Sequence, residues 1–148
     1  MKNELGRFRF PEIPLVFVGF ILNFYWELVQ SPLYDDIYRK TYFQILKSRL
    51  HCTLGDVFIL TGAYWLISLL VGDRYWMTLF RPLHLLGFTL MGLGYTVFSE
   101  WVNIDIRSAW GYSALMPRFP WLGTGLAPVI QWLILPSVTL WVTRKISI

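Results

Sequence analysis

The chain has 148 residues, of which 55% are apolar and only 15% are charged, and its mean hydropathy is +0.49. Soluble domains are about 45–50% apolar and about 25% charged, so this composition excludes a disordered chain and fits a soluble globular domain poorly. The length allows one domain. The net charge of +4 comes from basic residues between apolar segments, which indicates phospholipid headgroups as partners and argues against nucleic acid.

Four apolar segments are long enough to cross a bilayer as helices, which requires about 20 residues each. They run from about 13 to 31, 55 to 72, 83 to 102 and 126 to 143. The apolar runs are too long, and alternate too little, for the strands of a membrane barrel. The sequence therefore predicts an all-α integral membrane bundle of four helices in a single domain, residues 1–148.

Four crossings place both ends of the chain on one membrane face, and we expect no cleaved signal peptide before the first span. The connections 32–54 and 104–124 lie on the other face, which we call the capped face. Lys and Arg divide almost evenly between the two faces, with a small excess beside the chain ends. By the positive-inside rule this excess weakly favours cytoplasmic ends. We expect a multi-pass protein of a membrane such as the bacterial inner membrane.

Both connections on the capped face are long and not polar. Residues 37–50 place apolar side chains on one broad helical stripe, which predicts an interfacial amphipathic helix in the headgroup plane. A simple basic loop is the alternative. Residues 104–124 are rich in Trp, Pro and Gly, and Pro117 and Pro120 interrupt any regular span. We expect this segment to cover the bundle as a capping or re-entrant loop.

The polar residues of the predicted spans lie near the capped face. Ionisable residues within a membrane are costly and usually face the bundle interior, so we expect a shared polar pocket there. In the first span the spacing i, i+4, i+7 puts the polar residues on one helical face. The residues that converge from the four spans are Asn23, Glu27, Gln30, His51, Asp56, Glu100, Asn103 and Gln131.

Each of these residues also has a structural interpretation. Thr53 and Asp56 fit a T-x-x-D cap that would open the second span, with Asp56 at the positive end of the helix dipole. In this interpretation Glu27 and Glu100 lie close enough to the interface to be hydrated, above all Glu100 at the end of its span, and His51 is an ordinary interfacial histidine. The amides would then hydrogen-bond neighbouring helices, as amides commonly do in membranes.

Three kinds of chemistry fit such a pocket. Glu27 and Glu100 would form an acid–base pair assisted by His51 and Asp56. The same set without Asp56 would hold a divalent metal ion, although the sequence contains no HExxH or ExxH motif. In the third interpretation the polar residues only hold the helices together. The residues expected to contact a substrate are Asn23, Gln30, Asn103, Trp110, Tyr112 and Gln131.

We therefore predict a small membrane-embedded enzyme that acts on an apolar, lipid- or isoprenoid-like substrate through a carboxylate and histidine pocket. The alternative is a non-enzymatic accessory subunit that packs against other membrane proteins and binds lipid, quinone or pigment. The single cysteine, Cys52, excludes an internal disulfide and a CxxC redox pair.

Overall fold

The computed structural model describes residues 10–79 and 81–147 of the chain. Each of its four long helices is long and apolar enough to cross a membrane, so the predicted all-α membrane bundle is confirmed. These helices are α1 (Glu12–Gln30), α2 (Tyr42–Val71), α3 (Pro82–Trp101) and α4 (Leu126–Ser147). The short helices are the 3₁₀ turns η2 (Ser31–Leu33), η3 (Asp35–Tyr38) and η4 (Trp76–Thr78), and the π-helical turn η5 (Val102–Ile106).

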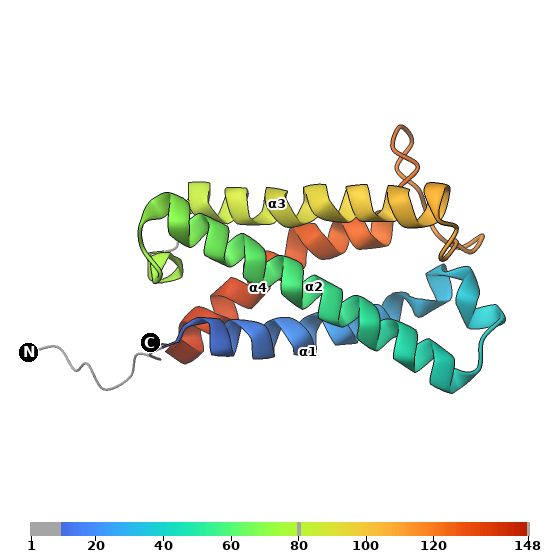
Figure 1. Ribbon diagram of the computed structural model, residues 1–148, viewed down its shortest axis with the longest axis horizontal. Coiled ribbons are helices and arrows are strands. Elements are labelled where there is room, and N and C mark those ends of the chain that lie inside the picture. The colour runs from blue at the N-terminus through green and yellow to red at the C-terminus, as the bar shows by residue number, and fades with distance from the viewer. Residues whose placement is uncertain (1–9, 80, 148) are drawn as a thin grey trace, which may run out of the picture.

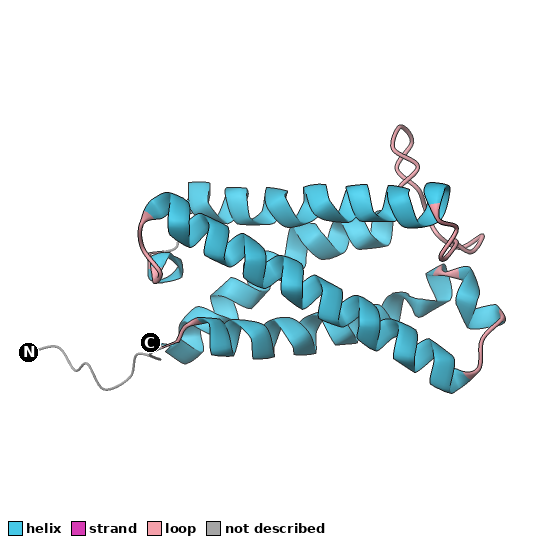
Figure 2. Ribbon diagram, viewed as in Figure 1, coloured by secondary structure: helices cyan, strands magenta, loops and turns pink. Residues whose placement is uncertain are grey.

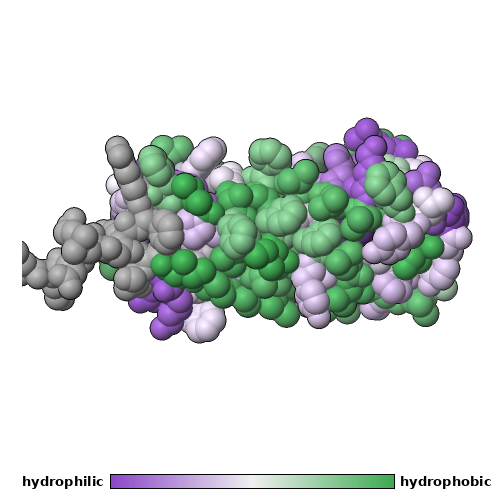
Figure 3. Space-filling view, turned by 90° about the horizontal axis from the view of Figure 1, so that it is seen from below, coloured by the Kyte–Doolittle hydropathy of each residue, from purple (hydrophilic) through white to green (hydrophobic). Residues whose placement is uncertain are grey.

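The four helices form a closed antiparallel ring. α1 packs on α2 and α4, and α3 packs on α2 and α4. The described loops gather at the two ends of the bundle (Figure 2), and α1 begins at the same end at which α4 finishes (Figure 1). A belt of apolar side chains covers the middle of the visible surface, whereas hydrophilic residues gather toward the ends (Figure 3). This distribution matches a bilayer, in which lipid tails cover the middle of the bundle.

Helix α2 begins much earlier than the sequence interpretation placed it. It contains 30 residues and opens at a capping box. The Thr41 hydroxyl accepts from the backbone of Gln44 at 3.4 Å, and the Gln44 side chain accepts from the backbone of Thr41 at 3.0 Å. Because no proline follows in α2, the helix continues through 42–50 into the span. The predictions of a separate helix over 37–50 in the headgroup plane, and of a loop there, were therefore wrong.

The predicted T-x-x-D cap was also wrong, since it falls in the interior of α2. The Thr53 hydroxyl donates to the carbonyl of Arg49 at 2.8 Å, which is a bond within one helical turn. At about 1.5 Å per residue α2 is about 45 Å long, whereas the hydrocarbon core is about 30 Å thick. The first turns of α2 therefore reach into the headgroup layer.

The segment 104–124 caps the bundle. The backbone N–H of Asp35 donates to the carbonyl of Gly111 at 3.0 Å, and that of Ser113 donates to the carbonyl of Leu33 at 2.9 Å. These two bonds form a short antiparallel bridge between the cap and the connection that follows α1. The cap is thus held to the capped end of the bundle by the backbone itself.

At the opposite end, Glu12 and Arg74 join the start of α1 to the connection between α2 and α3. The guanidinium of Arg74 donates to both carboxylate oxygens of Glu12, at 2.7 and 2.8 Å. The indole of Trp65 donates to the same carboxylate at 3.3 Å. Bidentate pairs of this kind are strong and also fix the orientation of the two side chains. At both ends of the bundle, contacts between segments distant in the sequence therefore hold the helices together.

In the middle of the bundle, α3 and α4 approach each other closely at one point. Trp132, which is 2% exposed, packs its ring against Gly92 so closely that a Cβ atom there would lie 2.0 Å from Cζ3 of the indole. One turn later, Pro136 removes the backbone donor that the carbonyl of Trp132 would otherwise receive. Figure 1 shows that α4 changes direction part-way along its length, passing from α3 toward α1.

We predict that Gly92→Ala destabilises the protein by about 1–3 kcal/mol, because the new methyl group forces the Trp132 ring out of its place. Gly94→Ala is the matched control, since nothing lies within 4 Å of a Cβ at that position. The control is expected to be neutral or slightly stabilising, because alanine favours helix over glycine. Thermal unfolding in detergent, followed by tryptophan fluorescence, compares the two. Equal melting temperatures would contradict the prediction.

Candidate functional site

A pocket of about 460 Å³ lies among all four helices near the capped face. Its volume falls within the range of small-molecule sites, about 300–1,000 Å³. Of the residues singled out in the sequence, it is lined by Glu27, Gln30, His51, Asp56, Glu100, Asn103, Trp110 and Gln131. Asn23 and Tyr112 are not part of its wall, although each holds a residue that is.

Three carboxyl groups from three helices line this pocket. Glu27 of α1 and Glu100 of α3 are 5% and 8% exposed, and Asp56 of α2 is half-buried. Each of the three interacts electrostatically with the other two. Repulsion between carboxylates is strong where water is scarce, so a proton held within the group relieves it. The arrangement can therefore offer a proton donor and a proton acceptor side by side.

Amide side chains orient two of these carboxyl groups. The amide of Gln30 donates to Glu27 at 2.7 Å. The amide of Gln131 donates to Asp56 at 2.9 Å and to Asn23 at 2.9 Å. Asn23 in turn donates to the carbonyl of Gly19 at 2.8 Å and is almost completely buried. Asn23 thus supports the pocket from behind, through Gln131.

The third carboxyl group, Glu100, is held by the cap. The hydroxyl of Tyr112 donates to Glu100 and accepts from the backbone N–H of Gly125 at 2.8 Å. Burial raises the pKa of the Tyr112 phenol, and the Glu100 carboxylate raises it further. Burial and the same carboxylate also raise the pKa of Tyr34. The Tyr112 hydroxyl therefore stays protonated and remains a donor to Glu100 at physiological pH.

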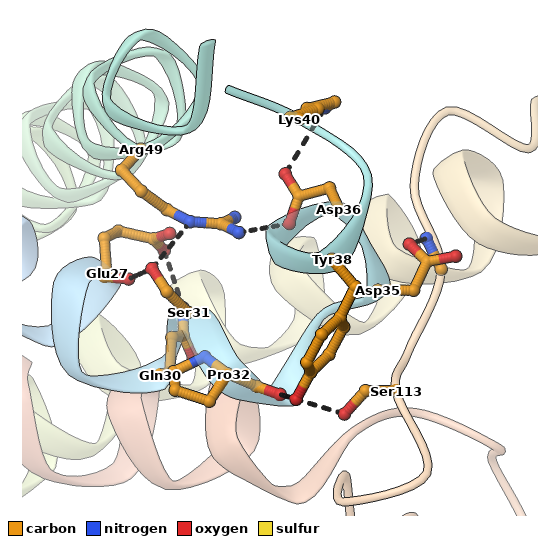
Figure 4. A network of polar contacts seen from close by, with 11 residues as sticks. Glu27, Gln30, Ser31, Pro32, Asp35, Asp36, Tyr38, Lys40, Arg49 and Ser113 are labelled. Carbon is orange, nitrogen blue, oxygen red and sulfur yellow. Dashed lines mark hydrogen bonds and ion pairs between the residues drawn. The ribbon is translucent and has the colours of Figure 1, made fainter. Parts of the chain in front are cut away.

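The buried cation of the pocket is Arg49, which the sequence interpretation missed. It is 3% exposed, and its guanidinium donates to Asp36 and to the hydroxyl of Ser31, the latter at 2.9 Å (Figure 4). The ammonium of Lys40 donates to the other oxygen of Asp36 at 3.3 Å. Arg49 also interacts electrostatically with Glu27. A positive charge thus lies beside the carboxyl group of α1, within the pocket wall.

Arg49 was missed because the prediction of an in-plane helix assigned it to the lipid headgroups. In the continuous helix α2, Arg49, Thr53 and Asp56 lie at i, i+4 and i+7 and share one face. The sequence did contain the signal, since Thr41 and Gln44 match the S/T-x-x-Q pattern of a capping box. A helix that begins there carries the arginine inward with the aspartate.

His51 lines the pocket but is exposed, unlike the carboxyl groups deeper inside. Among the residues that the structure describes, no group of three or more His, Cys, Asp and Glu side chains is arranged to hold a metal ion. Glu27, His51 and Glu100 therefore do not form the ligand set that the metal interpretation requires.

Comparison of the chain with protein families, with curated proteins and with solved structures finds no match. The pocket combines three carboxyl groups and one buried guanidinium with the amides and the phenol that orient them.

We predict that Arg49→Met destabilises the protein by about 3 kcal/mol, because it leaves Asp36 buried with only Lys40 as a partner. Arg39→Met is the control: it removes an exposed ion pair with Asp35, which contributes about 0–1 kcal/mol. Unfolding midpoints in mixed micelles measure the difference. If the two variants are equally stable, Arg49 does not hold the capped end together.

We also predict that Tyr112→Phe lowers stability by about 1–3 kcal/mol, because Glu100 and the N–H of Gly125 both lose their partner. The control, Tyr38→Phe, removes an exposed hydroxyl that makes one long bond of 3.4 Å, and it is expected to change stability by less than about 0.5 kcal/mol. Hydrogen exchange across 104–124 should become faster in the first variant alone. Unchanged exchange would show that the hydroxyl does not fasten the cap.

Proposed function

We propose that this protein is a small membrane-embedded enzyme that performs acid–base chemistry on an apolar, lipid- or isoprenoid-like substrate. The observation that carries the proposal is the grouping of Glu27, Asp56 and Glu100 in one pocket of a membrane-spanning bundle. Ionisable groups at this depth are costly to keep, and they usually mark a functional site. We place the protein in a membrane such as the bacterial inner membrane, with the start of α1 toward the cytoplasm.

The route to the pocket supports a substrate that comes from the bilayer. Phe58 of α2 and Tyr95 of α3 line the pocket, and they are 78% and 53% exposed. Gly55, which also lines the pocket, is exposed and has open space beside its Cα. We infer that the pocket opens sideways between α2 and α3, so that an apolar molecule can reach the carboxyl groups without leaving the lipid.

The proposed chemistry is a proton transfer to the substrate and a second proton transfer away from it. A neutral carboxyl group, Glu100 or Asp56, donates a proton to a carbon–carbon double bond. Glu27, whose negative charge the neighbouring Arg49 stabilises, removes a proton from an adjacent carbon. The sum is an isomerisation, which needs no oxidant. If a second double bond of the substrate attacks the cation before the proton is removed, its π electrons form the ring bond and the sum is a cyclisation. Trp110 and Trp132 also line the pocket, and their indole rings suit a cationic intermediate.

The test is solvent deuterium exchange in the intact protein. The protein is placed in nanodiscs made with membrane lipids from its native host, in D₂O, and the recovered lipids are examined by mass spectrometry. We expect deuterium to enter an isoprenoid or other unsaturated lipid with the wild-type protein. Glu27→Gln and Glu100→Gln should lower this rate by about 100-fold or more, which is the usual contribution of a positioned acid or base.

Asp105→Asn is the matched control, because Asp105 is an exposed carboxyl group near the same face that does not line the pocket. It should exchange at the wild-type rate. Lipids that gain no deuterium with the wild-type protein would refute the enzyme. The accessory-subunit function would be favoured if a second membrane protein co-purified in fixed proportion and Glu27→Gln released it.

A further inference from the structure

The basic and acidic side chains of the pocket lie at different depths. Its exposed ionisable members near the capped end are the side chains of Lys40, His51 and Arg107. Arg107 follows η5, and the structure records no hydrogen bond or ion pair of its side chain with any described residue. These three side chains form a basic rim around the outer part of the pocket, and we call them the rim.

The carboxyl groups lie deeper than the rim. Glu100 precedes Arg107 by seven residues, and at no more than about 1.5 Å per residue this separates their backbones by at most about 10 Å along α3 and the π-helical turn η5. Tyr95, at the lateral opening, lies five residues further still. Asp36 is the acidic group that lines the pocket near the rim, but Arg49 and Lys40 offset its charge. The pocket is therefore basic at the headgroup level, acidic below it and apolar at its opening to the lipid.

We propose that the rim binds the phosphate of an amphiphilic substrate, so that the substrate of the proposed enzyme is a phosphorylated lipid, such as an isoprenyl phosphate. This inference rests on the proposed function and names its substrate class. A phosphate is attracted to Arg107 and Lys40 and is repelled by the carboxyl groups below, so the molecule can enter in one orientation only. Its chain then runs down past Glu100 toward the opening between α2 and α3.

This orientation has a chemical consequence. With the phosphate at the rim, the carboxyl group of Glu100 lies below it by up to about 10 Å, because seven residues separate Glu100 from Arg107. The proton transfers then act on a carbon of the substrate's apolar chain. The phosphate only positions the substrate, and its bond to the chain is not broken. The rim does not need to stabilise a leaving group, which agrees with the solvent-exposed position of Arg107.

The test measures binding without turnover. The purified protein is held in nanodiscs of phosphatidylcholine, and the affinities of farnesyl phosphate, farnesol and inorganic phosphate are compared. We expect farnesyl phosphate to bind at least about tenfold more tightly than either of the other two. Arg107→Gln should weaken its binding by about tenfold or more, as loss of a charged hydrogen bond does, and should leave farnesol unchanged. Arg107→Lys should restore part of the loss.

Lys47→Gln is the matched control, because Lys47 is exposed near the same end of α2 but does not line the pocket. An equal loss of farnesyl phosphate binding in Lys47→Gln and Arg107→Gln would overturn the proposal, since general surface charge would then explain the attraction. If inorganic phosphate binds as tightly as farnesyl phosphate, the site takes free phosphate, and the proposal of a phosphorylated lipid is overturned. If farnesol and farnesyl phosphate bind equally tightly, the rim does not bind the phosphate and the proposal is overturned.

The two proposals fail separately. Farnesyl phosphate binding without any exchange would refute the enzyme and leave the rim intact. If Arg107→Gln keeps the wild-type rate of deuterium exchange and the wild-type affinity for farnesyl phosphate, the phosphate-binding proposal is refuted and the proposed enzyme function is not.

Discussion

A charged or hydrogen-bonding group inside a bilayer must find its partner within the protein, because hydrocarbon offers none. The buried pairing of Arg49 with Asp36 meets this constraint and determines how the capped end is built. It ties the third turn of α2 to the connection that follows α1, and the same connection carries the backbone bridge to the cap. The cap in turn positions the Tyr112 hydroxyl, which donates a hydrogen bond to Glu100. The buried pairing of Arg49 with Asp36 is therefore the first of a chain of contacts that positions the cap and, through it, Glu100.

The same constraint separates the two halves of the bundle. Toward the opposite face the interior is filled by apolar side chains such as Leu15, Leu60 and Leu140, and the polar contacts of Glu12 with Arg74 and Trp65 lie at the very end of the bundle. Toward the capped face, Pro136 redirects α4 and the ring of Trp132 occupies the space beside Gly92. Beyond that indole the helices enclose a cavity instead of a packed core. The cavity is thus placed where the chain can supply amides, phenols and a guanidinium to support acidic groups.

Much of the candidate site could be predicted from the sequence, because the direction of each span is fixed once four crossings are recognised. Glu27, Asp56, Glu100 and Gln131 had to lie at one end of the bundle, and the structure brings them into one pocket. The sequence pattern did not reveal which residues form the wall and which support it from behind. Asn23 satisfies the same helical spacing as Glu27, but its neighbour across the bundle, Gln131, separates it from the cavity.

By itself the sequence determined the membrane class, the number of spans and the end of the bundle at which polar groups gather, because hydrophobic length and helical periodicity are local properties. The tertiary structure alone decided three further features. They are the continuation of α2 back to Tyr42, the burial of Arg49 and the exposure of His51. Each depends on the chain that packs against the residue, and that neighbour is distant in sequence. A basic residue near a membrane face is compatible with headgroups and with an interior partner, and only the position of Asp36 distinguishes them.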